Sequence, residues 1–401
     1  MRILILHNRY QQAGGEDAVV RSEKSLLESR GHEVRVMEAD NDGILGVAAK
    51  VRTAFTAIYS LHSKQLVSAE LNRFQPHVVH VHNFFPTLTP SVFYSCVGAG
   101  VPVVQTLHNY RLLCPAAVLY RNGHVCESCV GKTFQWPGVL HGCYRESRKG
   151  TLAVAAMNAA HHLAGTWNRA VDMYISLTEF GRGKYIAAGM PPDKIVVKGH
   201  FLDVDPGAGT GDQQCVVYVG RLSAEKGIDT LLRAWQLPGA QIPLKIIGAG
   251  PLEDECRNAS ASNPWIEYLG PMRPAEVYEW MGRAQALMLP SNCYEGFPRT
   301  IVEAFAKGTP AIASGHGAML EAVEHGRTGL HFKPGDAQSL ITQVEWMLEH
   351  PEKWREMRSN ARTEYETRHS ANSNYFQLMD IYRRAMAAKK GLHVALNPIT
   401  Q

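Results

Sequence analysis

The sequence predicts an α/β protein made of two successive sets of parallel strands and helices. Its 401 residues are too many for one ordinary domain and suit two domains of roughly 150–200 residues each. Short apolar runs alternate with segments of helical periodicity, which is the order expected of a parallel sheet. A stretch rich in glycine, proline and aspartate, residues 201–214, interrupts this order and is typical of a linker between domains.

The first set opens at the N-terminus. An apolar run over residues 2–7 predicts a strand, the helical pattern over 18–31 ends at a glycine, and 32–38 alternates like a second strand. Two more apolar runs, at 77–83 and 100–109, supply further strands. This β–loop–α–β order predicts a parallel sheet, whose ligands bind beyond the carboxyl ends of the strands.

The second set begins with a strand, a loop and a helix over residues 214–236. The elements predicted after it are strands at 244–250, 284–291 and 310–315, a helix at 298–308, and mostly helix beyond 335. Two facing sheets of this kind would place one ligand in the cleft between the domains.

Composition excludes some classes of function. Hydrophobic residues make up 45% and charged residues 19%, so the chain can bury substantial cores. A net charge of +4 is too weak to argue for nucleic acid as a partner. No apolar run approaches about 18 residues, and the N-terminus suits a first strand better than a secretion signal, so we expect a cytoplasmic protein that can still sit on a membrane surface.

The stretch "NCYEGFPRTIVEAFAKG", residues 292–308, carries two carboxylates, Glu295 and Glu303. Pro298 suits a helix's first turn, which would bring the amides of Gly296 and Phe297 to the positive end of the helix, where phosphate binds. Glu295 can accept hydrogen bonds from sugar hydroxyls, and Glu303 can hold a ribose through its paired hydroxyls. The alternative is that Glu295 only favours the helix dipole and Glu303 is a solvated helix residue.

A second candidate is "GRLSAEKG", residues 220–227, which follows a strand and opens a helix. Arg221 and Lys226 can turn toward one anion and neutralise a diphosphate leaving group, and Gly227 allows a close backbone approach. Two ordinary surface cations are the alternative.

The first loop between a predicted strand and helix contains "AGGED", residues 13–17. It lacks the GxGxxG fingerprint, although Gly14 and Gly15 can bring the backbone close to a phosphate or sugar. A plain glycine turn explains it equally well.

Two histidines, His82 and His108, end neighbouring predicted strands, where side chains tend to face a ligand. A packed, hydrogen-bonded histidine is the alternative for each.

Four of the eight cysteines fall close together, namely Cys114, Cys126, Cys129 and Cys143. Their CxxC pair with two flanking thiols suits a tetrahedral zinc site that would staple the loop 110–145, although the outer spacings are longer than in common zinc ribbons. Four thiolates would leave no open position, so such a zinc would be structural. Buried thiols are the alternative, and disulfides are the least expected.

Residues 51–67 form an amphipathic stretch with Lys50, Arg52 and Lys64 nearby. Such a segment can touch an anionic membrane or a lipid-linked acceptor. A helix that packs within its domain is the alternative.

Together these motifs resemble the retaining glycosyltransferases of family 4, whose GT-B architecture consists of two Rossmann-like domains facing across a cleft. The EX7E motif is found in Glu295 and Glu303, and "GRLSAEKG" matches the GRxxxxKG loop. "IIGAGP" (246–251) and "YLGPM" (268–272) match the next two signatures. "HNYRLLCP" (108–115) and the cysteine region resemble a subgroup of polysaccharide and lipopolysaccharide enzymes.

The resemblance implies a role for each matching residue. Residues 1–202 would form an acceptor-binding domain, on which 374–401 pack back, and residues 203–373 would bind the nucleotide sugar. Arg221 and Lys226 would hold the diphosphate, and Glu303 would bind the ribose. Glu295 would contact the transferred sugar, with the amides of 296–298 nearby, and Gly270 to Met272 would frame the base. Gly15 and His108 would come from the first domain when the cleft closes.

The resemblance also implies the chemistry. The transferred sugar would keep its anomeric configuration, by front-face attack in which the leaving phosphate helps to deprotonate the acceptor. Charge on the diphosphate would be met by Arg221, Lys226 and the helix N-terminus, so no metal is expected in catalysis. One departure stands out, because Ala318 replaces the second glycine of the family's GGxxE loop before Glu321.

Two other functions remain open at this stage. A nucleotide-sugar epimerase of similar shape would turn over its substrate without an acceptor, but it gives no reason for the two paired motifs. A non-catalytic protein that binds nucleotide sugars predicts damaged motifs, whereas Arg221, Lys226, Glu295 and Glu303 are all present.

Overall fold

A computed structural model describes residues 1–9, 14–39 and 56–391 of the chain. Its residues divide into two compact units. The first comprises Met1–Ala117, Glu127–Lys198 and Asn374–Gln401, and the second comprises Val118–Cys126 and Gly199–Ser373. Predicted helices and strands are present in both units, which confirms the α/β class.

The first unit is built on a parallel sheet of six strands in the order β2-β1-β3-β4-β7-β8. The strands are β1 (Arg2–Asn8), β2 (Glu33–Ala39), β3 (Val78–Asn83), β4 (Val103–Leu107), β7 (Met173–Ser176) and β8 (Ile195–Val197). The helices are α1 (Gly15–Ser29), α3 (Leu61–Phe74), α4 (Ser91–Gly98), α5 (Trp136–His141), α6 (Arg148–Leu163), α7 (Thr166–Arg169), α8 (Glu179–Ala187) and α16 (Ala371–Lys389).

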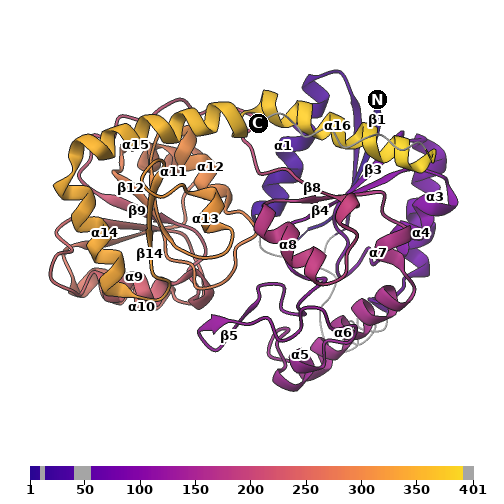
Figure 1. Cartoon of the computed structure of the whole chain (residues 1–401), viewed down its shortest axis with the longest axis horizontal. Coiled ribbons are helices and arrows are strands. Elements are labelled where there is room, and N and C mark those ends of the chain that lie inside the picture. Colours follow the sequence, from indigo (N-terminus) through magenta and orange to yellow (C-terminus); the bar gives the residue numbers. More distant parts are fainter. Residues whose placement is uncertain (10–13, 40–55, 392–401) are drawn as a thin grey trace. The chain divides into compact units, whose positions relative to one another are not determined.

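Strand β1 lies between β2 and β3 in this sheet, which explains its unbroken apolar run. Ile3 pairs with Val34 on one side and with Val78 on the other, so both edges of the strand are covered by neighbouring strands. The last helix, α16, packs residues such as Leu378 and Tyr382 against this strand region (Figure 1).

The second unit contains a parallel sheet in the order β11-β10-β9-β12-β13-β14. Its strands are β9 (Val216–Val219), β10 (Leu244–Ile247), β11 (Ile266–Gly270), β12 (Ala286–Leu289), β13 (Ala311–Ser314) and β14 (Gly329–Phe332), and a hairpin is formed by β5 (Tyr120–Arg121) and β6 (His124–Val125). Its helices are α9 (Ile228–Ala234), α10 (Glu253–Ser262), α11 (Pro274–Arg283), α12 (Arg299–Ala306), α13 (Met319–Ala322), α14 (Ala337–Glu349) and α15 (Pro351–Glu364).

Helices cover both faces of the second sheet (Figure 1). Val216 and Tyr218 of β9 enter the core that contains α9 and α14, whereas Val217 points into the opposite core with α12. This alternation follows from the two-residue period of a strand.

The stretch 201–214, which its composition predicted to be a linker between domains, packs within the second unit. Amides of Gly209 and Gly211 donate to the carbonyls of Lys307 and Gly282, both within the second unit. A Cβ at Gly209 would lie 2.2 Å from the backbone of Gly282, so glycine serves close packing at this point. The two units meet along the chain between Lys198 and Gly199.

None of the helices in the described ranges is long and apolar enough to cross a membrane.

Candidate functional site

The loop after β9 is shaped by Gly227. This residue has φ +74°, and a Cβ there would lie 1.8 Å from the carbonyl oxygen of Pro290. Only glycine fits such a left-handed position against another backbone. A short 3₁₀ turn, Ala224–Lys226, precedes it and places Lys226 at the carboxyl end of the sheet.

The loop after β12 is tied to this first loop. The amides of Asn292 and Cys293 both donate to the carbonyl of Glu225, at 2.9 and 3.3 Å. The two motif regions that the sequence singled out, around Lys226 and Glu295, are therefore neighbours in the second unit.

Lys226 and Glu295 form an ion pair. The Lys226 ammonium lies 2.6 and 2.8 Å from the two carboxylate oxygens, and the Ser291 hydroxyl donates to Glu295 Oε1 at 2.6 Å. Burial would raise the pKa of Glu295, but Lys226 and Ser291 outweigh it and hold that pKa below its usual value. Burial likewise opposes the charge of Lys226, yet Glu295 leaves the pKa of Lys226 raised. Both groups are therefore ionised at neutral pH.

Helix α12 begins one residue later than expected. Pro298 is the N-cap and Arg299 is the first helical residue, so the amides of Gly296 and Phe297 come directly before the helix. The Phe297 ring contacts the rings of His200 and His369, at centroid distances of 6.0 and 5.5 Å. These contacts hold the loop against the core of the second unit.

Glu303 lies one turn into α12 and faces Arg299. Its carboxylate is 3.2 Å from Arg299 Nε, and its side chain is only 16% exposed, so the alternative of a solvated helix residue is wrong. Burial raises the pKa of Glu303, and Arg299 only partly opposes this. Arg299 Nη1 is buried and makes no hydrogen bond within the described part of the chain. A ligand hydroxyl can satisfy such a group.

The other predicted residues of the second unit are Arg221, Gly270 and Met272, together with the substituted position Ala318. Arg221 is exposed, and its carbonyl accepts a hydrogen bond from the Tyr218 hydroxyl at 2.7 Å. Gly270 ends β11 with φ +75°, and Met272 packs against the core that contains α12. Ala318 is buried with φ −63°, because the left-handed position falls on Gly317 (φ +56°). The departure from the family's glycine pair therefore costs no backbone strain.

In the first unit, Gly15 is the first residue of α1. Asp17 connects this helix start to β1, since it accepts from the Gly14 amide at 2.7 Å and contacts His7 Nε2 at 2.8 Å. Glu16 accepts from Asn109 Nδ2 at 2.8 Å, which joins the loop after β4 to the same place.

His82 and His108 lie at the carboxyl ends of β3 and β4. His82 is 4% exposed, so the packed alternative holds for this residue. His108 is half-buried, and its Nε2 lies 2.9 Å from His82 Nδ1. Both line a pocket that also includes Phe85, Asn109 and Arg111.

Comparison with known proteins now decides the family. The profile described as "Glycosyltransferase Family 4" matches residues 13–205, and the one described as "Glycosyl transferases group 1" matches residues 206–364. The chain belongs to the GT4-type glycosyltransferases.

Relatives of this GT4-type chain act in several settings. D-rhamnosyltransferase WbpZ of Pseudomonas aeruginosa is 30% identical over 153 residues, which are 37% of this chain and 40% of that protein. Amylovoran biosynthesis glycosyltransferase AmsK of Erwinia amylovora is 25% identical over 231 residues, 53% of this chain and 56% of that one. The matches span about a third to somewhat over half of the length of these curated relatives.

Solved structures agree on the fold. HepE of Anabaena, in complex with UDP and glucose, has a TM-score of 0.66 at 18% identity and covers 95% of this chain and 98% of its own. Sucrose-phosphate synthase of Thermosynechococcus elongatus has a TM-score of 0.71 at 17% identity, with coverages of 96% and 99%. The chain therefore has the GT-B fold, with two Rossmann-like units, as predicted.

The cysteines of this GT4-type chain are divided between the units. Cys114, Cys129 and Cys143 belong to the first unit, and Cys126 follows the hairpin of the second. None of the eight cysteines, all of which are described, forms a disulfide. The structural zinc site stays a prediction.

The predicted amphipathic stretch 51–67 is only partly described. Lys50, Arg52 and residues up to 55 lie outside the described ranges, and the helix that follows, α3, begins at Leu61 with Ser60 as its N-cap. Lys64 lies over the ring of Tyr59, 5.9 Å from its centroid.

Sequence reasoning missed several residues of these two sites. Ser291 holds Glu295, and His316 contacts the Ser291 carbonyl at 2.9 Å. Glu23 and Lys198, in the first unit, form a buried pair behind His82. Glu23 carried a signal, because it is a charged residue within the apolar stripe of a predicted helix.

Proposed function

We propose that this GT4-type chain transfers a sugar from a nucleotide-sugar donor to a hydroxyl of a glycan, a lipid-linked or a small-molecule acceptor, with retention of configuration. One observation carries the proposal: the ion pair of Lys226 and Glu295 joins two strand-end loops directly before α12. A cation and a carboxylate at one point suit a diphosphate next to a sugar, because the ammonium group can pair with the phosphate charge and the carboxylate can accept hydrogen bonds from sugar hydroxyls.

The donor would be held in three parts. Arg221 and Lys226 bind the diphosphate, and Glu303 accepts from the ribose hydroxyls. Glu295, with the amides of Gly296 and Phe297, meets the transferred sugar, while the backbone of 270–272 frames the base. The half-buried state of Glu303 and the unsatisfied Arg299 beside it support a ligand at this place. The UDP and glucose bound to HepE support a nucleoside diphosphate sugar.

Catalysis would consist mainly of stabilising the leaving group. The bond between the anomeric carbon and the phosphate oxygen breaks, the acceptor oxygen bonds to the same face of that carbon, and its proton passes to the leaving phosphate. Negative charge develops on the diphosphate as this bond breaks, and Arg221, Lys226 and the N-terminus of α12 would stabilise it. Gly15 and His108 of the first unit would contact the donor or acceptor.

A role in surface polysaccharide or glycoconjugate synthesis is part of the proposal, and the amylovoran relative supports it. Such acceptors are often tied to lipid, so a membrane-facing surface is expected. The first unit offers one in α5, α6 and the segment before them.

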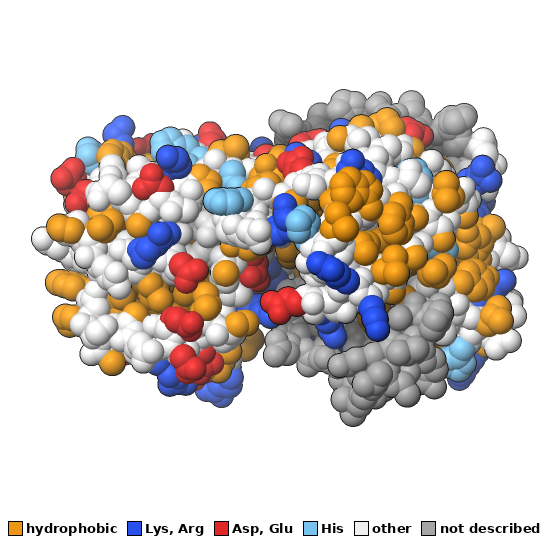
Figure 2. All heavy atoms as spheres, turned by 90° about the horizontal axis from the view of Figure 1, so that it is seen from below, with side chains coloured by type: hydrophobic (Ala, Val, Ile, Leu, Met, Phe, Trp, Pro, Cys, Tyr) orange, Lys and Arg blue, Asp and Glu red, His pale blue; other side chains and the backbone are white. Residues whose placement is uncertain are grey.

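Helix α6 presents an apolar side to solvent. Leu152 and Leu163 are 47% and 78% exposed, and no Asp, Glu, Lys or Arg occurs between Lys149 and Arg169. Phe134, Trp136 and Leu140 add exposed apolar area, and Figure 2 shows such side chains gathered on one face of the first unit with Lys and Arg beside them.

Cations border this apolar surface. Residues 130–169 contain five Lys or Arg and one Glu, although the whole chain has a net charge of only +4. Apolar side chains bordered by cations suit an anionic lipid surface, such as the cytoplasmic leaflet. We therefore place the protein in the cytoplasm, at the inner face of the membrane.

Sedimentation with lipid vesicles tests this surface. The chain should bind vesicles containing anionic phosphatidylglycerol, and bind less at high salt. Leu152→Glu/Leu163→Glu should lose binding, whereas Leu348→Glu, at an exposed leucine of the second unit, should keep it. Equal binding by all three proteins, or none by the wild type, removes the membrane contact from the proposal.

The donor is tested by thermal shift with UDP-, GDP-, ADP- and dTDP-sugars. A ligand bound only by the folded state raises the melting temperature, by an amount equivalent to about 2.7 kcal/mol at a hundred times Kd. One nucleotide class should stabilise the wild type but not Arg221→Ala. Turnover of that donor without any acceptor would favour an epimerase, and binding without turnover under any condition would favour a non-catalytic protein.

A further inference from the structure

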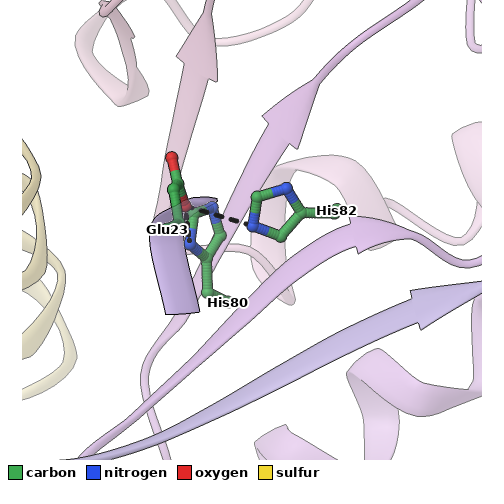
Figure 3. A group of neighbouring side chains, drawn as sticks. All are labelled: Glu23, His80 and His82. Carbon is green, nitrogen blue, oxygen red and sulfur yellow. Dashed lines mark ion pairs between the residues drawn. The ribbon is translucent and has the colours of Figure 1, made fainter. Parts of the chain in front are cut away.

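One group of buried polar side chains outside the candidate donor site lies in the first unit (Figure 3). Glu23 Oε2 is 3.4 Å from His80 Nδ1 and 3.3 Å from His82 Nε2, an arrangement that could be considered for a metal ion. Lys198 Nζ lies 3.0 Å from the other oxygen of Glu23, so the charge of this carboxylate is already balanced within the chain. A divalent cation would bring an excess of positive charge into this buried space, which does not favour a metal there.

A larger cavity lies in the second unit, at the amino edge of its sheet. Its volume is about 350 Å³, within the range of sites for small molecules. Gln214 and Gln285 line it, and they precede β9 and β12, which pair with each other in parallel. Lys226 and Glu295 follow the same two strands, at the carboxyl edge. The cavity is therefore separate from the candidate donor site.

Arg358 lines this cavity from the second turn of α15 and carries a charge without a counter-charge. Its Nη1 donates to the carbonyl of Ala284 at 2.9 Å, and its Nη2 to the carbonyl of Gly282 at 3.4 Å. Both partners are neutral, and within residues 1–9, 14–39 and 56–391 no carboxylate forms an ion pair with Arg358. Burial lowers the pKa of Arg358, as expected of a cation that leaves water without meeting an anion.

The next arginine along the same helix has its counter-charge. Arg362, one turn later, forms an ion pair with Asp205. Asp212 is close to the cavity in the chain, but its carboxylate faces Arg283 at 3.4 Å. In the part of the chain that the structure describes, Arg358 therefore has room for an anion that the protein itself does not supply.

The backbone is shaped around this guanidinium group. Gly211 has φ +62°, and a Cβ there would lie 2.6 Å from Arg358 Cζ, so any other residue would push the guanidinium group aside. The Gly211 amide donates at 2.9 Å to the carbonyl of Gly282, the same carbonyl that Arg358 contacts. The cation is thus held at a fixed place on the cavity wall.

A second guanidinium group, that of Arg355, also lines the cavity. Arg355 pairs with Glu352, and the two side chains are 68% and 79% exposed. An exposed pair of this kind contributes little to stability, so Arg355 can turn toward a ligand. Two planar guanidinium groups suit a phosphate group, because each can donate two parallel hydrogen bonds to its oxygens.

The remaining wall of the cavity is partly polar and partly apolar. Thr210 and Gln214 are exposed polar residues that can form hydrogen bonds with hydroxyl groups. Leu348 and Pro351 offer exposed apolar contact. This mixture suits the hydroxyls and the carbon atoms of a sugar.

We infer that this cavity binds a sugar phosphate, with the phosphate group on Arg358 and Arg355 and the sugar against the remaining wall. The site lies at the opposite edge of the sheet from the donor loops, so the inference does not depend on the proposed function. Inorganic phosphate has the same charged group but lacks the sugar, and it should bind more weakly.

Isothermal titration calorimetry with ribose 5-phosphate, inorganic phosphate and ribose tests the inference. Ribose 5-phosphate should bind most tightly, and its affinity should decrease as the salt concentration rises. Ribose alone should not bind measurably. Equal affinity for the two phosphates overturns the part of the inference that concerns the sugar. Absence of binding by both phosphates at millimolar concentration overturns the whole.

Gln214→Glu is the sharpest variant, because it adds a carboxylate to the cavity wall and leaves both contacts of Arg358 with the backbone intact. The affinity for ribose 5-phosphate should decrease about ten-fold or more, since like charges repel at close range. Gln338→Glu is the matched control, with the same change at an exposed residue near the other end of α14. The control should bind like the wild type, and equal binding by both variants overturns the inference.

A phosphate could instead bind at the donor loops, which Lys226→Met tests. Binding that is lost in Lys226→Met but kept in Gln214→Glu overturns the inference. Trp354 gives a local readout, because it lines the cavity and its Nε1 donates to the carbonyl of Gln285 at 2.9 Å. Its indole NMR signal, assigned with Trp354→Phe, should shift with ribose 5-phosphate in the wild type and in Lys226→Met, but not in Gln214→Glu. A signal that stays in place while the wild type binds the ligand also overturns the inference.

Discussion

Each of the two units holds a carboxylate and an ammonium group in contact near the carboxyl edge of its sheet. Glu23 and Lys198 are 3.0 Å apart with side chains 1% and 4% exposed, and Glu295 and Lys226 are 2.6 Å apart with side chains 11% and 31% exposed. The chemistry of the pairs is the same, but access to water differs. A buried pair cannot exchange partners, whereas a partly exposed pair can turn toward a ligand.

The difference follows from where the residues lie in the fold. Glu23 is on the buried side of α1, and Lys198 follows the edge strand β8. Glu295 and Lys226 lie on loops after β12 and β9, held together by backbone hydrogen bonds. Ion pairs on helices facing a sheet therefore fix structure, and those on strand-end loops remain available for binding.

The largest expected effect comes from breaking the buried pair. Glu23→Ala should lower the free energy of unfolding by about 3–5 kcal/mol, because Lys198 would be left charged and unpaired inside the unit. Chemical denaturation measures the change. Glu267→Ala removes an exposed partner of Lys245 and should cost less than about 1 kcal/mol.

The double variant Glu23→Leu/Lys198→Met separates charge from packing. It should regain most of the stability lost by Glu23→Ala, since replacing both charges by apolar groups removes the unpaired ion. A double variant as unstable as the single one would show that the pair is not the source of the loss.

Breaking the partly exposed pair should affect transfer more than folding. Glu295→Ala should decrease kcat/KM by roughly 10²–10³-fold, the usual cost of removing one group that stabilises a transition state. Its free energy of unfolding should decrease by only about 1 kcal/mol, because the pair is partly solvated. Transfer at the wild-type rate would remove Glu295 from the site.

Local patterns predicted most of this arrangement. Strands such as β1 and β9 are continuous apolar runs, so periodicity was sufficient to predict them. Each of the two motif loops is made of residues close together in the chain, so their spacing was sufficient to identify them. Gly227 was predicted to let the backbone approach an anion closely, and in the fold it also makes room for the Pro290 carbonyl oxygen, which would lie 1.8 Å from a Cβ at this position.

Long-range pairing was not predictable in the same way. Glu23 and Lys198 are 175 positions apart, and nothing local to Lys198 indicates a partner on α1. The packing of the stretch 201–214 was not predictable for a different reason, because glycine occurs in linkers and in closely packed backbones alike. Composition does not distinguish these two uses, whereas contacts in the fold do.

Acid should weaken the first unit through its buried histidines. Burial lowers the pKa of His80 well below its usual value, and it lowers the pKa of His161 as well. Below pH 6.5 these histidines bind protons in the unfolded chain but remain neutral in the folded one. The free energy of unfolding therefore decreases as the pH falls, by up to about 1.4 kcal/mol per pH unit for each histidine.

Glu23 adds a second decrease at lower pH. The pKa of Glu23 is lower in the folded protein than in the unfolded chain. Its contribution to the free energy of unfolding is therefore complete above about pH 4.5, and is lost as the pH falls toward the pKa of the folded protein. Denaturation curves at pH 7.5, 6.5, 5.5, 4.5 and 3.5 measure both steps. A free energy of unfolding that stays constant between pH 7.5 and 5.5 would contradict the first step.

The smallest expected effect is the coupling energy between Lys226 and Glu295. Its measurement is the most direct test of whether this pair can exchange its partners for a ligand. A double-mutant cycle with Lys226→Met and Glu295→Gln should give a coupling energy of about 1 kcal/mol or less in the free protein. The nucleoside diphosphate that stabilises the wild type should lower this coupling, because Lys226 then shares its charge between phosphate and carboxylate. The same cycle on Glu23 and Lys198, with the same substitutions, should give a larger coupling that the ligand leaves unchanged. If the ligand changes neither coupling, the Lys226–Glu295 pair is as fixed as the buried one, and the diphosphate must be bound by Arg221 and the helix start alone.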